Sequence, residues 1–350
     1  MLAALVAVVA VVVGHVADGP WTDAPTEARV DQKAELAVVV VDGAHVLAPA
    51  GITRVTLHGH AHRTAPLAAT VRWFTVEPHG FRAEPATNGA TSDFYSNVST
   101  EAATFGRWLG YDHIDYFERP LAATTPIIPA AIDDDDQLAG LGTLRFKAVV
   151  TLPGGRVIAS PGAESTDTFG ITAAVHRVSI RAADDFLGWL TAYLLVPEVF
   201  GSAGGGKNHQ TERFDGADCA DVMVGALRRT GRALAYTNVA GLPAYTTRVA
   251  PPTELDDHGL PATPITGVRR GDLIRIDYGG ELRHHTPRDW DHVAALYEDK
   301  SDPAGPHKGG PDGQLDGFDL VIHMGHPHLI IEPLADQAPA TVDVLRWKAR

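Results

Sequence analysis

The sequence is poor in cysteine and in positive charge, and both shortages limit what the protein can be. Cys219 is the one cysteine in 350 residues, so no disulfide can form within the chain, and cysteine usage does not indicate a redox compartment. Lys and Arg number 29 against 43 Asp and Glu, which gives a formal net charge of −14. A surface that follows nucleic-acid phosphates needs an excess of Lys and Arg, so we expect no nucleic-acid partner.

The N-terminal apolar run covers residues 2–13. It is too short to span a bilayer comfortably and has the length of a signal-peptide core. We therefore expect residues 1–20 to be a signal peptide or N-terminal anchor, and the protein to be secreted, periplasmic or otherwise in the cell envelope. The alternative interpretation of the same run is a short buried strand.

Residues 30–180 carry the pattern of a β domain. Short runs of alternating apolar and polar residues are separated by turn signals, with almost no helical periodicity. This favours an antiparallel β-sandwich of immunoglobulin-like type. Val55 and Leu57 alternate with His58, His60 and His62, which predicts one strand with a histidine row on its exposed face. No carboxylate is aimed at that row, so we expect no metal there.

Residues 181–350 differ, because apolar residues recur there at helical spacing. One helix is predicted over 186–195 and ends before Pro197, and a second begins at Cys219, with Asp215 and Gly216 as cap and turn residues. A thiol in the first turn of a helix faces unpaired backbone N–H groups and the positive end of the helix dipole, which favours the thiolate. The chain as a whole is therefore predicted to be α+β.

A cysteine nucleophile needs a base, and the sequence offers one downstream. His292 opens an apolar strand and can act as that base, and His323, on a later strand, can orient its imidazole. A lone cysteine is also commonly just a small buried side chain. The histidine strand favours the catalytic interpretation.

Several other stretches imitate ligand-binding loops. Residues 201–207 are Gly-rich and end in Lys207, but a helix precedes them and Asn208 stands where a phosphate-binding loop has Ser or Thr, so we expect no nucleotide. The Asp run 133–136 and the stretch 312–316 lack the ligand spacing of a calcium loop. The Gly- and Pro-rich insertion 301–318 is equally compatible with a lid beside a cleft. No metal or cofactor is expected.

In the C-terminal half, five motifs together resemble the NlpC-type cell-wall cysteine peptidases. In chain order, the stretches that carry the resemblance are Val-Pro-Glu-Val-Phe-Gly-Ser at 196–202, Asp-Cys-Ala-Asp at 218–221, Gly-Asp-Leu-Ile at 271–274, His-Val-Ala-Ala-Leu-Tyr at 292–297 and Val-Ile-His at 321–323. The resemblance implies a papain-like α+β fold, in which a helix bearing Cys packs on an antiparallel sheet bearing His. It also implies cleavage of amide bonds in peptidoglycan stem peptides, with Cys219, His292 and His323 as the catalytic residues.

The chain departs from the family pattern near the expected substrate. Glu198 stands where the family has a tyrosine, and Ala220 and Asp221 replace Ser-Gly after the nucleophile. We expect Glu198, Asp218 and Asp221 to contact substrate. The insertion between His292 and His323 is longer than the family's hairpin.

Because of that insertion, His326 or His328 is an alternative third catalytic residue. Two other functions also stay open. A transglutaminase-like acyltransferase also places Cys at a helix start, but it expects an aromatic residue after the His, where this chain has Val293. A catalytically inactive module for cell-wall binding or adhesion would leave Cys219 merely packed.

Overall fold

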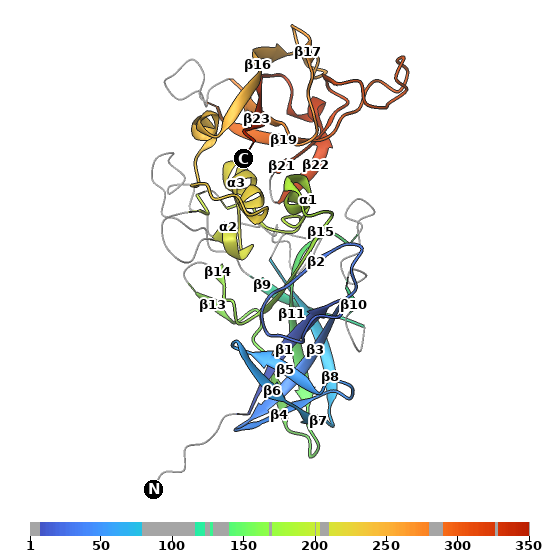
Figure 1. Cartoon of the computed structure of the whole chain (residues 1–350), viewed down its shortest axis with the longest axis vertical. Helices are drawn as coiled ribbons and strands as arrows, with labels where there is room; N and C mark the ends of the chain where they lie inside the picture. The colour runs from blue at the N-terminus through green and yellow to red at the C-terminus, as the bar shows by residue number, and fades with distance from the viewer. Residues whose placement is uncertain are drawn as a thin grey trace, which may run out of the picture. The chain divides into compact units, whose positions relative to one another are not determined.

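The computed structural model describes residues 8–78, 116–122, 127–128, 140–167, 170–199, 201–203, 210–279, 290–325 and 328–349 (Figure 1). The chain divides into two compact units. Unit 1 comprises Met1–Ala183 with Thr191–Val196 and Arg213–Asp215, and unit 2 comprises Asp184–Leu190, Pro197–Glu212 and Gly216–Arg350. Strands predominate over helices, so the protein is a β-rich α+β protein. Within the described ranges, no helix has the length and apolar character needed to cross a membrane.

Unit 1 is built from two main sheets. The first has the order β1-β3-β4-β7, with β10 also paired to β3, and the second has the order β2-β15-β11-β8-β9, with β12 also paired to β11. Strand β1 of the first sheet contacts β11 and β12 of the second. The bounds of these strands are β1 Val8–Val16, β2 Thr26–Arg29, β3 Ala34–Asp42, β4 His45–Ala48, β7 Ala65–Pro66, β8 Thr70–Pro78, β9 Tyr116–Pro120, β10 Ile127–Ile128, β11 Gly142–Thr151, β12 Val157–Ala159 and β15 His176–Arg181.

The sequence pattern favours a wholly antiparallel sandwich, but the structure of unit 1 also contains parallel strand pairs. Strand β2 runs parallel to β15, and β7 runs parallel to β4. The other pairs in the two sheets are antiparallel. Alternation of apolar residues marks a strand but carries no information about the direction of its neighbour, which is why the sequence missed both parallel pairs.

The N-terminal apolar run forms strand β1 from Val8 onward. It pairs with β3 from Val8 opposite Asp42 to Val16 opposite Ala34 (Figure 1). Val13 is fully buried and belongs to an apolar cluster that also contains Val39. Residues 8–16 therefore form a strand with several buried side chains.

The histidine row is a hairpin and not one strand. Strand β5 (Arg54–Leu57) pairs with β6 (His60–Arg63), and the chain reverses at His58 and Gly59. Both turn residues have positive φ, 49° and 78°, as the tight hairpin turn that matches strand twist requires. The prediction of a single strand is wrong because Gly59 is a turn residue and not a strand residue. His58 is thereby separated from the strand that carries His60 and His62.

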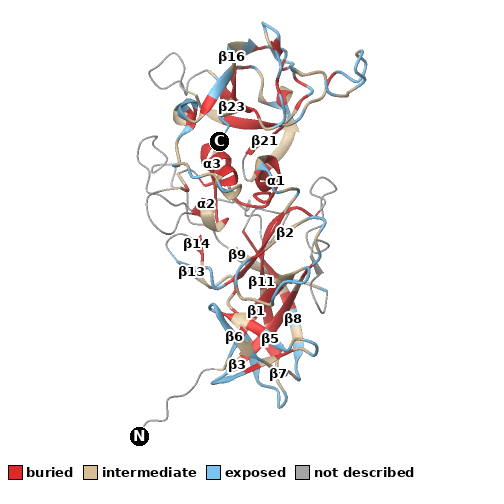
Figure 2. Ribbon diagram, in the orientation of Figure 1, coloured by how far each residue is buried: buried red, intermediate tan, exposed pale blue. Residues whose placement is uncertain are grey.

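Unit 2 contains a six-stranded antiparallel sheet with the order β16-β23-β18-β19-β21-β22. Its core is formed by apolar side chains from most of these strands, and Figure 2 shows the buried residues concentrated on the inner strands and on α3. The strands of this sheet are β16 Thr246–Leu255, β18 Leu273–Asp277, β19 His292–Glu298, β21 Leu320–Met324, β22 Leu329–Pro333 and β23 Ala340–Trp347. Unit 2 also contains the small pair of β17 Ile265–Thr266 with β20 Gln314–Leu315, and unit 1 contains the small pair of β13 Thr166–Asp167 with β14 Gly170–Ile171.

The helices of unit 2 are short. They are α1 Phe186–Thr191, whose last residue belongs to unit 1, α2 Gln210–Arg213, whose last residue also belongs to unit 1, α3 Cys219–Arg229, and the 3-10 helices η1 Val239–Ala244 and η2 Leu334–Gln337. Helix α3 confirms the predicted helix at Cys219, but its N-cap is Asp218, so the expected cap at Asp215 is wrong. Helix α1 is shorter than the predicted 186–195.

Strand β16 contains two prolines, Pro251 and Pro252. This is possible because β16 is an edge strand whose register shifts on both sides of Ala250, and an edge with bulges tolerates residues that cannot donate a hydrogen bond. Strand β23 lies inside the sheet between β16 and β18.

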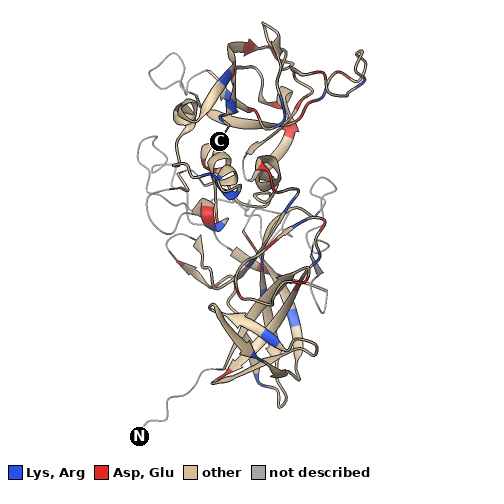
Figure 3. Ribbon diagram, in the orientation of Figure 1, with Lys and Arg blue, Asp and Glu red and all other residues tan. Residues whose placement is uncertain are grey.

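The insertion after β19 is an ordered loop fastened by its own aspartates, which stand out as acidic segments in Figure 3. Asp299 accepts hydrogen bonds from the backbone N–H groups of Asp312 and Gly313, and Asp319 accepts from those of Lys300 and Asp316. The carboxylates therefore serve as loop anchors. The Asp run at 133–136 lies outside the described residues.

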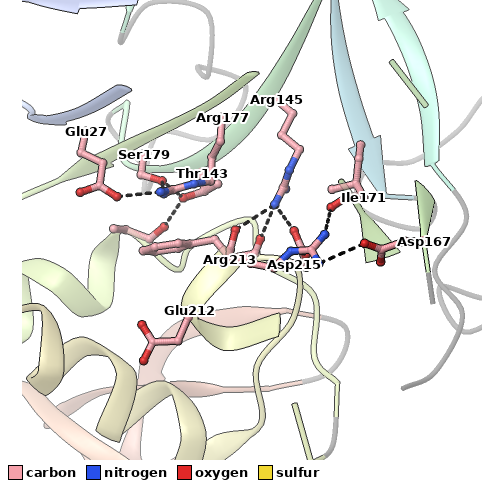
Figure 4. A network of polar contacts seen from close by, with 12 residues as sticks. Glu27, Thr143, Arg145, Asp167, Ile171, Arg177, Ser179, Glu212, Arg213 and Asp215 are labelled. Atoms are coloured by element: carbon pink, nitrogen blue, oxygen red, sulfur yellow. Dashed lines mark hydrogen bonds and ion pairs between the residues drawn. The ribbon is translucent and has the colours of Figure 1, made fainter. Parts of the chain in front are cut away.

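In unit 1, a buried ionic network holds the segment that leads toward α3 (Figure 4). Arg145 on β11 donates to the backbone carbonyls of Arg213 and Phe214 and pairs with the Asp215 carboxylate. Arg213 Nε also lies 2.6 Å from Asp215 Oδ2. Burial raises the pKa of Asp215 to about 6 in spite of the nearby guanidinium groups of Arg145, Arg213 and Arg177. The carboxylate is therefore costly to bury and depends on its cations.

The same network fixes Phe214, which has an unusual backbone conformation. Its φ is +59°, a left-handed conformation that is unfavourable for a bulky residue. Its ring is fully buried, stacks on Tyr193 with ring centroids 4.2 Å apart, and lies under the Arg177 guanidinium at 4.4 Å. Packing on both sides of the ring offsets the backbone strain.

Replacing Arg145 by Met leaves the buried Asp215 carboxylate without one of its two cations. We expect the free energy of unfolding of unit 1 to fall by about 3 kcal/mol, measured by urea denaturation. Lys147→Met is the matched control, because Lys147 lies on the same strand and pairs with the partly exposed Glu118, so that about 1 kcal/mol is expected. Adding Asp215→Asn to Arg145→Met should recover part of the loss. Equal effects of the two single changes would contradict this account.

Candidate active site

Helix α3 begins at Cys219 because Asp218 caps it. Asp218 Oδ1 accepts a hydrogen bond from the Asp221 backbone N–H at 2.7 Å, which satisfies one of the unpaired N–H groups of the first turn. Just before the cap, Gly216 and Ala217 run against Pro197–Val199, with Ala217 N–H donating to the Pro197 carbonyl and Val199 N–H to the Ala217 carbonyl. A Cβ on Gly216 would lie 2.4 Å from a Val199 methyl group, so this close approach requires glycine.

The two aspartates beside the cysteine fix a neighbouring loop. Asp218 Oδ2 accepts from the Gly201 backbone N–H at 3.0 Å. Asp221 Oδ2 accepts from the Ser202 hydroxyl at 2.9 Å and from the Ala203 N–H at 2.8 Å. Both carboxylates, expected to contact substrate, are thus already engaged in holding 201–203 against the start of α3.

The environment of these carboxylates shifts their pKa values upward. Burial raises the pKa of Asp218, and burial together with the Asp218 charge raises the pKa of Asp221 to about 7. Glu198, the third residue expected at the substrate, forms a β-bridge with Ala217 through its backbone. Its side chain is half-buried. The described part of the Gly-rich stretch, 201–203, belongs to this loop, and residues 204–209 lie outside the described ranges.

The two predicted histidines meet on neighbouring strands of the sheet. His292 begins β19 and His323 lies on β21, and His292 Nε2 is 2.8 Å from His323 Nδ1. The two rings are nearly perpendicular, at 87°, with centroids 4.8 Å apart. His323 is 3% exposed. Of the alternatives for this position, His328 Nδ1 instead lies 2.9 Å from the Leu329 carbonyl oxygen, and His326 lies outside the described residues.

The cysteine sulfur lies at the same end of β19. Helix α3 packs against β19 and β21 (Figure 1). The backbone N–H of Val293, the residue after His292, is close enough to the Cys219 thiol to lower its pKa. The thiol is also close enough to Tyr278 to raise the pKa of that phenol. The start of α3 and the start of β19 therefore converge on one place within unit 2.

The electrostatics of the thiol differ from the sequence prediction. Burial raises the pKa of Cys219 well above its ordinary value of 9.0, and the charges of Asp218 and Glu198 raise it further. The N–H groups of Val293 and Ala220 lower it, but by less. The prediction that the helix start favours the thiolate is wrong here, because burial and two nearby carboxylates outweigh the helix N-terminus.

The imidazole of His292 is shifted toward its neutral form. Burial, followed by the proximity of His323, lowers the pKa of His292 to about 3. A neutral thiol and a neutral imidazole are therefore the dominant forms of this pair at neutral pH.

Three further residues extend the histidine pair, and sequence reasoning missed them. His323 Nε2 lies 3.0 Å from Glu332 Oε1, and Gln337 Nε2 donates to the same oxygen at 2.5 Å. The Tyr278 hydroxyl donates to Gln337 Oε1. Glu332 lies on β22 opposite Val321, which puts it diagonally across from His323 on the same face of the sheet.

Among the residues that the structure describes, no group of three His, Cys, Asp or Glu side chains is arranged to hold a metal ion. The donors at this site are one thiol, two imidazoles joined to each other, and a carboxylate already shared by His323 and Gln337. This arrangement is suited to proton transfer along a line of hydrogen bonds, with a sulfur nucleophile at one end.

No protein-family model, curated protein sequence or solved structure matches this chain.

Proposed function

We propose that the protein is a cysteine hydrolase that cleaves amide bonds by acyl transfer, with Cys219 as nucleophile and His292 as general base. One observation carries this proposal. The start of α3, which carries the thiol, packs against β19, and the imidazole that begins β19 is bonded through Nε2 to His323. A nucleophile, a base and a group that orients the base are the parts that such chemistry requires.

The hydrogen bond of His292 determines which of its nitrogens can act. Nε2 is occupied by His323, so Nδ1 is the nitrogen left to exchange a proton with the thiol. The Cys219 sulfur attacks the substrate carbonyl carbon as its proton passes to Nδ1, which gives a tetrahedral intermediate. Collapse of that intermediate transfers the proton to the leaving amine and leaves a thioester. Water, deprotonated by His292, then releases the acid and restores the thiol.

The developing negative charge on the carbonyl oxygen needs a donor. In this proposal it is the backbone N–H of Cys219, which lies at the start of α3 where N–H groups have no partner within the helix. The positive charge that forms on His292 is stabilised along the line from His323 to the Glu332 carboxylate.

Peptidoglycan stem peptides are the proposed substrate class, and a papain-like fold is proposed for unit 2. Support comes from the order of the five motifs and from a cysteine helix packed on antiparallel strands that bear histidine. Unit 1 is proposed to be an immunoglobulin-like domain that binds or spaces the enzyme at the cell wall. An envelope location follows from the substrate, independently of the N-terminal run.

A specific observation disfavours a transglutaminase-like acyltransferase. That family expects an aromatic residue after the base and an Asp as the orienting residue, but here Val293 follows His292 and His323 orients it. If the protein were an inactive wall-binding module, the line of hydrogen bonds from Tyr278 to His292 would have no function.

The proposal is tested on purified sacculi. The wild-type protein should release soluble peptides with new amino termini, and Cys219→Ala and His292→Ala should each lower the rate by at least about 100-fold, because each removes an essential partner in proton transfer. His328→Gln is the matched control, since this histidine bonds to the Leu329 carbonyl and lies outside the proposed line, and it should retain wild-type release. Equal release by wild type and Cys219→Ala would refute the proposal.

The pKa shifts predict how Cys219 reacts with iodoacetamide. Only the thiolate reacts, and its fraction rises with pH through the pKa, which burial has raised. The rate should therefore be below that of a free thiol at neutral pH and should still be rising above pH 9.0. A plateau between about pH 5 and 8, as in enzymes that store a thiolate and imidazolium pair, would contradict the neutral resting pair.

A further inference from the structure

We propose that Glu332 is a positioning residue that sets the direction of the hydrogen bonds through His323 and so keeps Nδ1 of His292 unprotonated and available to the Cys219 thiol. This inference deepens the proposed function, and its kinetic consequence rests on that function. Its structural content, which nitrogen of each histidine carries the proton, can be measured without any turnover.

The need for such a residue follows from the identity of the orienting group. An Asn or Asp beside the base presents an oxygen that accepts a hydrogen bond. A neutral histidine has one nitrogen that donates and one that accepts, and its two tautomers reverse these roles. The 2.8 Å bond between His292 Nε2 and His323 Nδ1 is compatible with either direction. On its own, His323 therefore does not determine which nitrogen of His292 carries the proton.

Glu332 resolves this ambiguity. An ionised carboxylate only accepts hydrogen bonds, so its 3.0 Å contact requires the proton to be on His323 Nε2. His323 Nδ1 then carries a lone pair and accepts from His292 Nε2–H. With its proton on Nε2, neutral His292 has its lone pair on Nδ1. Glu332 thus sets the donor and acceptor roles in both hydrogen bonds, through two imidazole rings, although it does not contact the thiol itself.

Glu332 is held in the form that this requires. Its bond to His323 lowers its pKa, and a lowered pKa keeps the carboxylate ionised at neutral pH. Gln337 Nε2 donates to Oε1 at 2.5 Å, and the Gln337 amide is itself oriented by the Tyr278 hydroxyl, which donates to its oxygen. Burial keeps the Tyr278 phenol protonated by raising its pKa.

The Gln337 amide is an alternative hydrogen-bond partner for His323 Nε2. Its Nε2 lies 3.5 Å from His323 Nε2, so a small movement would let the amide donate to that nitrogen. Such a bond requires a lone pair on His323 Nε2 and thus a proton on Nδ1. His323 would then donate to His292, and the His292 proton would move to Nδ1, facing the thiol. Glu332 prevents this reversal, because the proton that it accepts stays on His323 Nε2 and leaves no lone pair there for the amide.

The direct test is the tautomer of each ring, read from the imidazole ¹⁵N resonances of the full chain labelled with ¹⁵N-histidine at neutral pH. Spectra of His292→Gln and His323→Gln assign the two rings. In the wild type both should carry the proton on Nε2. Glu332→Gln should keep this state, because an amide oxygen can accept in place of the carboxylate. Glu332→Lys, which places a donor there, and Glu332→Leu, which frees Gln337, should shift both rings toward Nδ1–H.

The kinetic test uses release from sacculi with the same variants. Glu332→Lys and Glu332→Leu should lower kcat by about 10- to 100-fold, the usual effect of losing a group that orients a functional histidine, with KM within about twofold. Glu332→Gln should retain most of the wild-type kcat. Adding Gln337→Leu to Glu332→Leu should recover part of the kcat that Glu332→Leu loses. Glu298→Lys is the matched control on the same sheet, because Glu298 is exposed and pairs only at 3.5 Å with Lys300.

The outcomes separate this inference from the proposed function. If the wild type releases nothing from sacculi but Glu332→Lys reverses the tautomers, the hydrolase proposal fails and the inference on Glu332 stands. If both Glu332→Lys and Glu332→Leu leave the tautomers and kcat at wild-type values, the inference is overturned while the hydrolase proposal is untouched. Because Glu332 is 24% exposed, a lysine can extend toward solvent, so folding of at least one variant is expected.

Discussion

The candidate site depends on the hydrogen bond between His292 and His323. This bond exists because β19 and β21 are antiparallel neighbours with Ala295 opposite Ile322. A shift of one residue in that register would turn one imidazole to the opposite face of the sheet and break the line. The apolar core of unit 2 fixes the register, since Leu296 and Val321, which are also opposite each other, are both fully buried in it.

The position of the cysteine is fixed by a different set of interactions. Asp218 caps α3, Gly216 lets the chain pass close to Val199, and the carboxylates of Asp218 and Asp221 hold the loop at 201–203. Upstream, in unit 1, Arg145 and Asp215 fasten the backbone around Phe214. The proposed nucleophile therefore begins a helix whose first turn is held by polar contacts, and the Asp218 carboxylate also raises the pKa of its thiol.

Much of unit 2 was predictable from local pattern. The helix at Cys219, the strands near residues 273, 292 and 320, and the residues proposed as nucleophile, base and orienting group all follow from apolar periodicity and motif order. What the sequence could not supply was register and burial. Glu332 lies nine residues after His323 along the chain, and only the pairing of β21 with β22 puts the two side chains on one face. The raised pKa of Cys219 likewise depends on burial, which no spacing of residues reveals.

Unit 1 shows the same limits. The hairpin at His58 and Gly59 was read as a straight strand, and the run that begins the chain was read by its length and hydrophobicity, while its pairing with β3 became apparent only in three dimensions. At His58 and Gly59 the local signal was compatible with a straight strand or a hairpin, and the pairing of β5 with β6 decided between them.

The central claim is that the Cys219 sulfur and the His292 imidazole lie within reach of one proton. A short bifunctional alkylating agent such as 1,3-dibromoacetone tests it most directly, because it joins a thiol to an imidazole only when the two face each other across a few ångströms. After digestion, mass spectrometry should identify a cross-linked peptide pair that contains Cys219 and His292, and His292→Gln should abolish it. Attachment of the reagent to Cys219 alone, or a link from Cys219 to a different residue, would contradict the account.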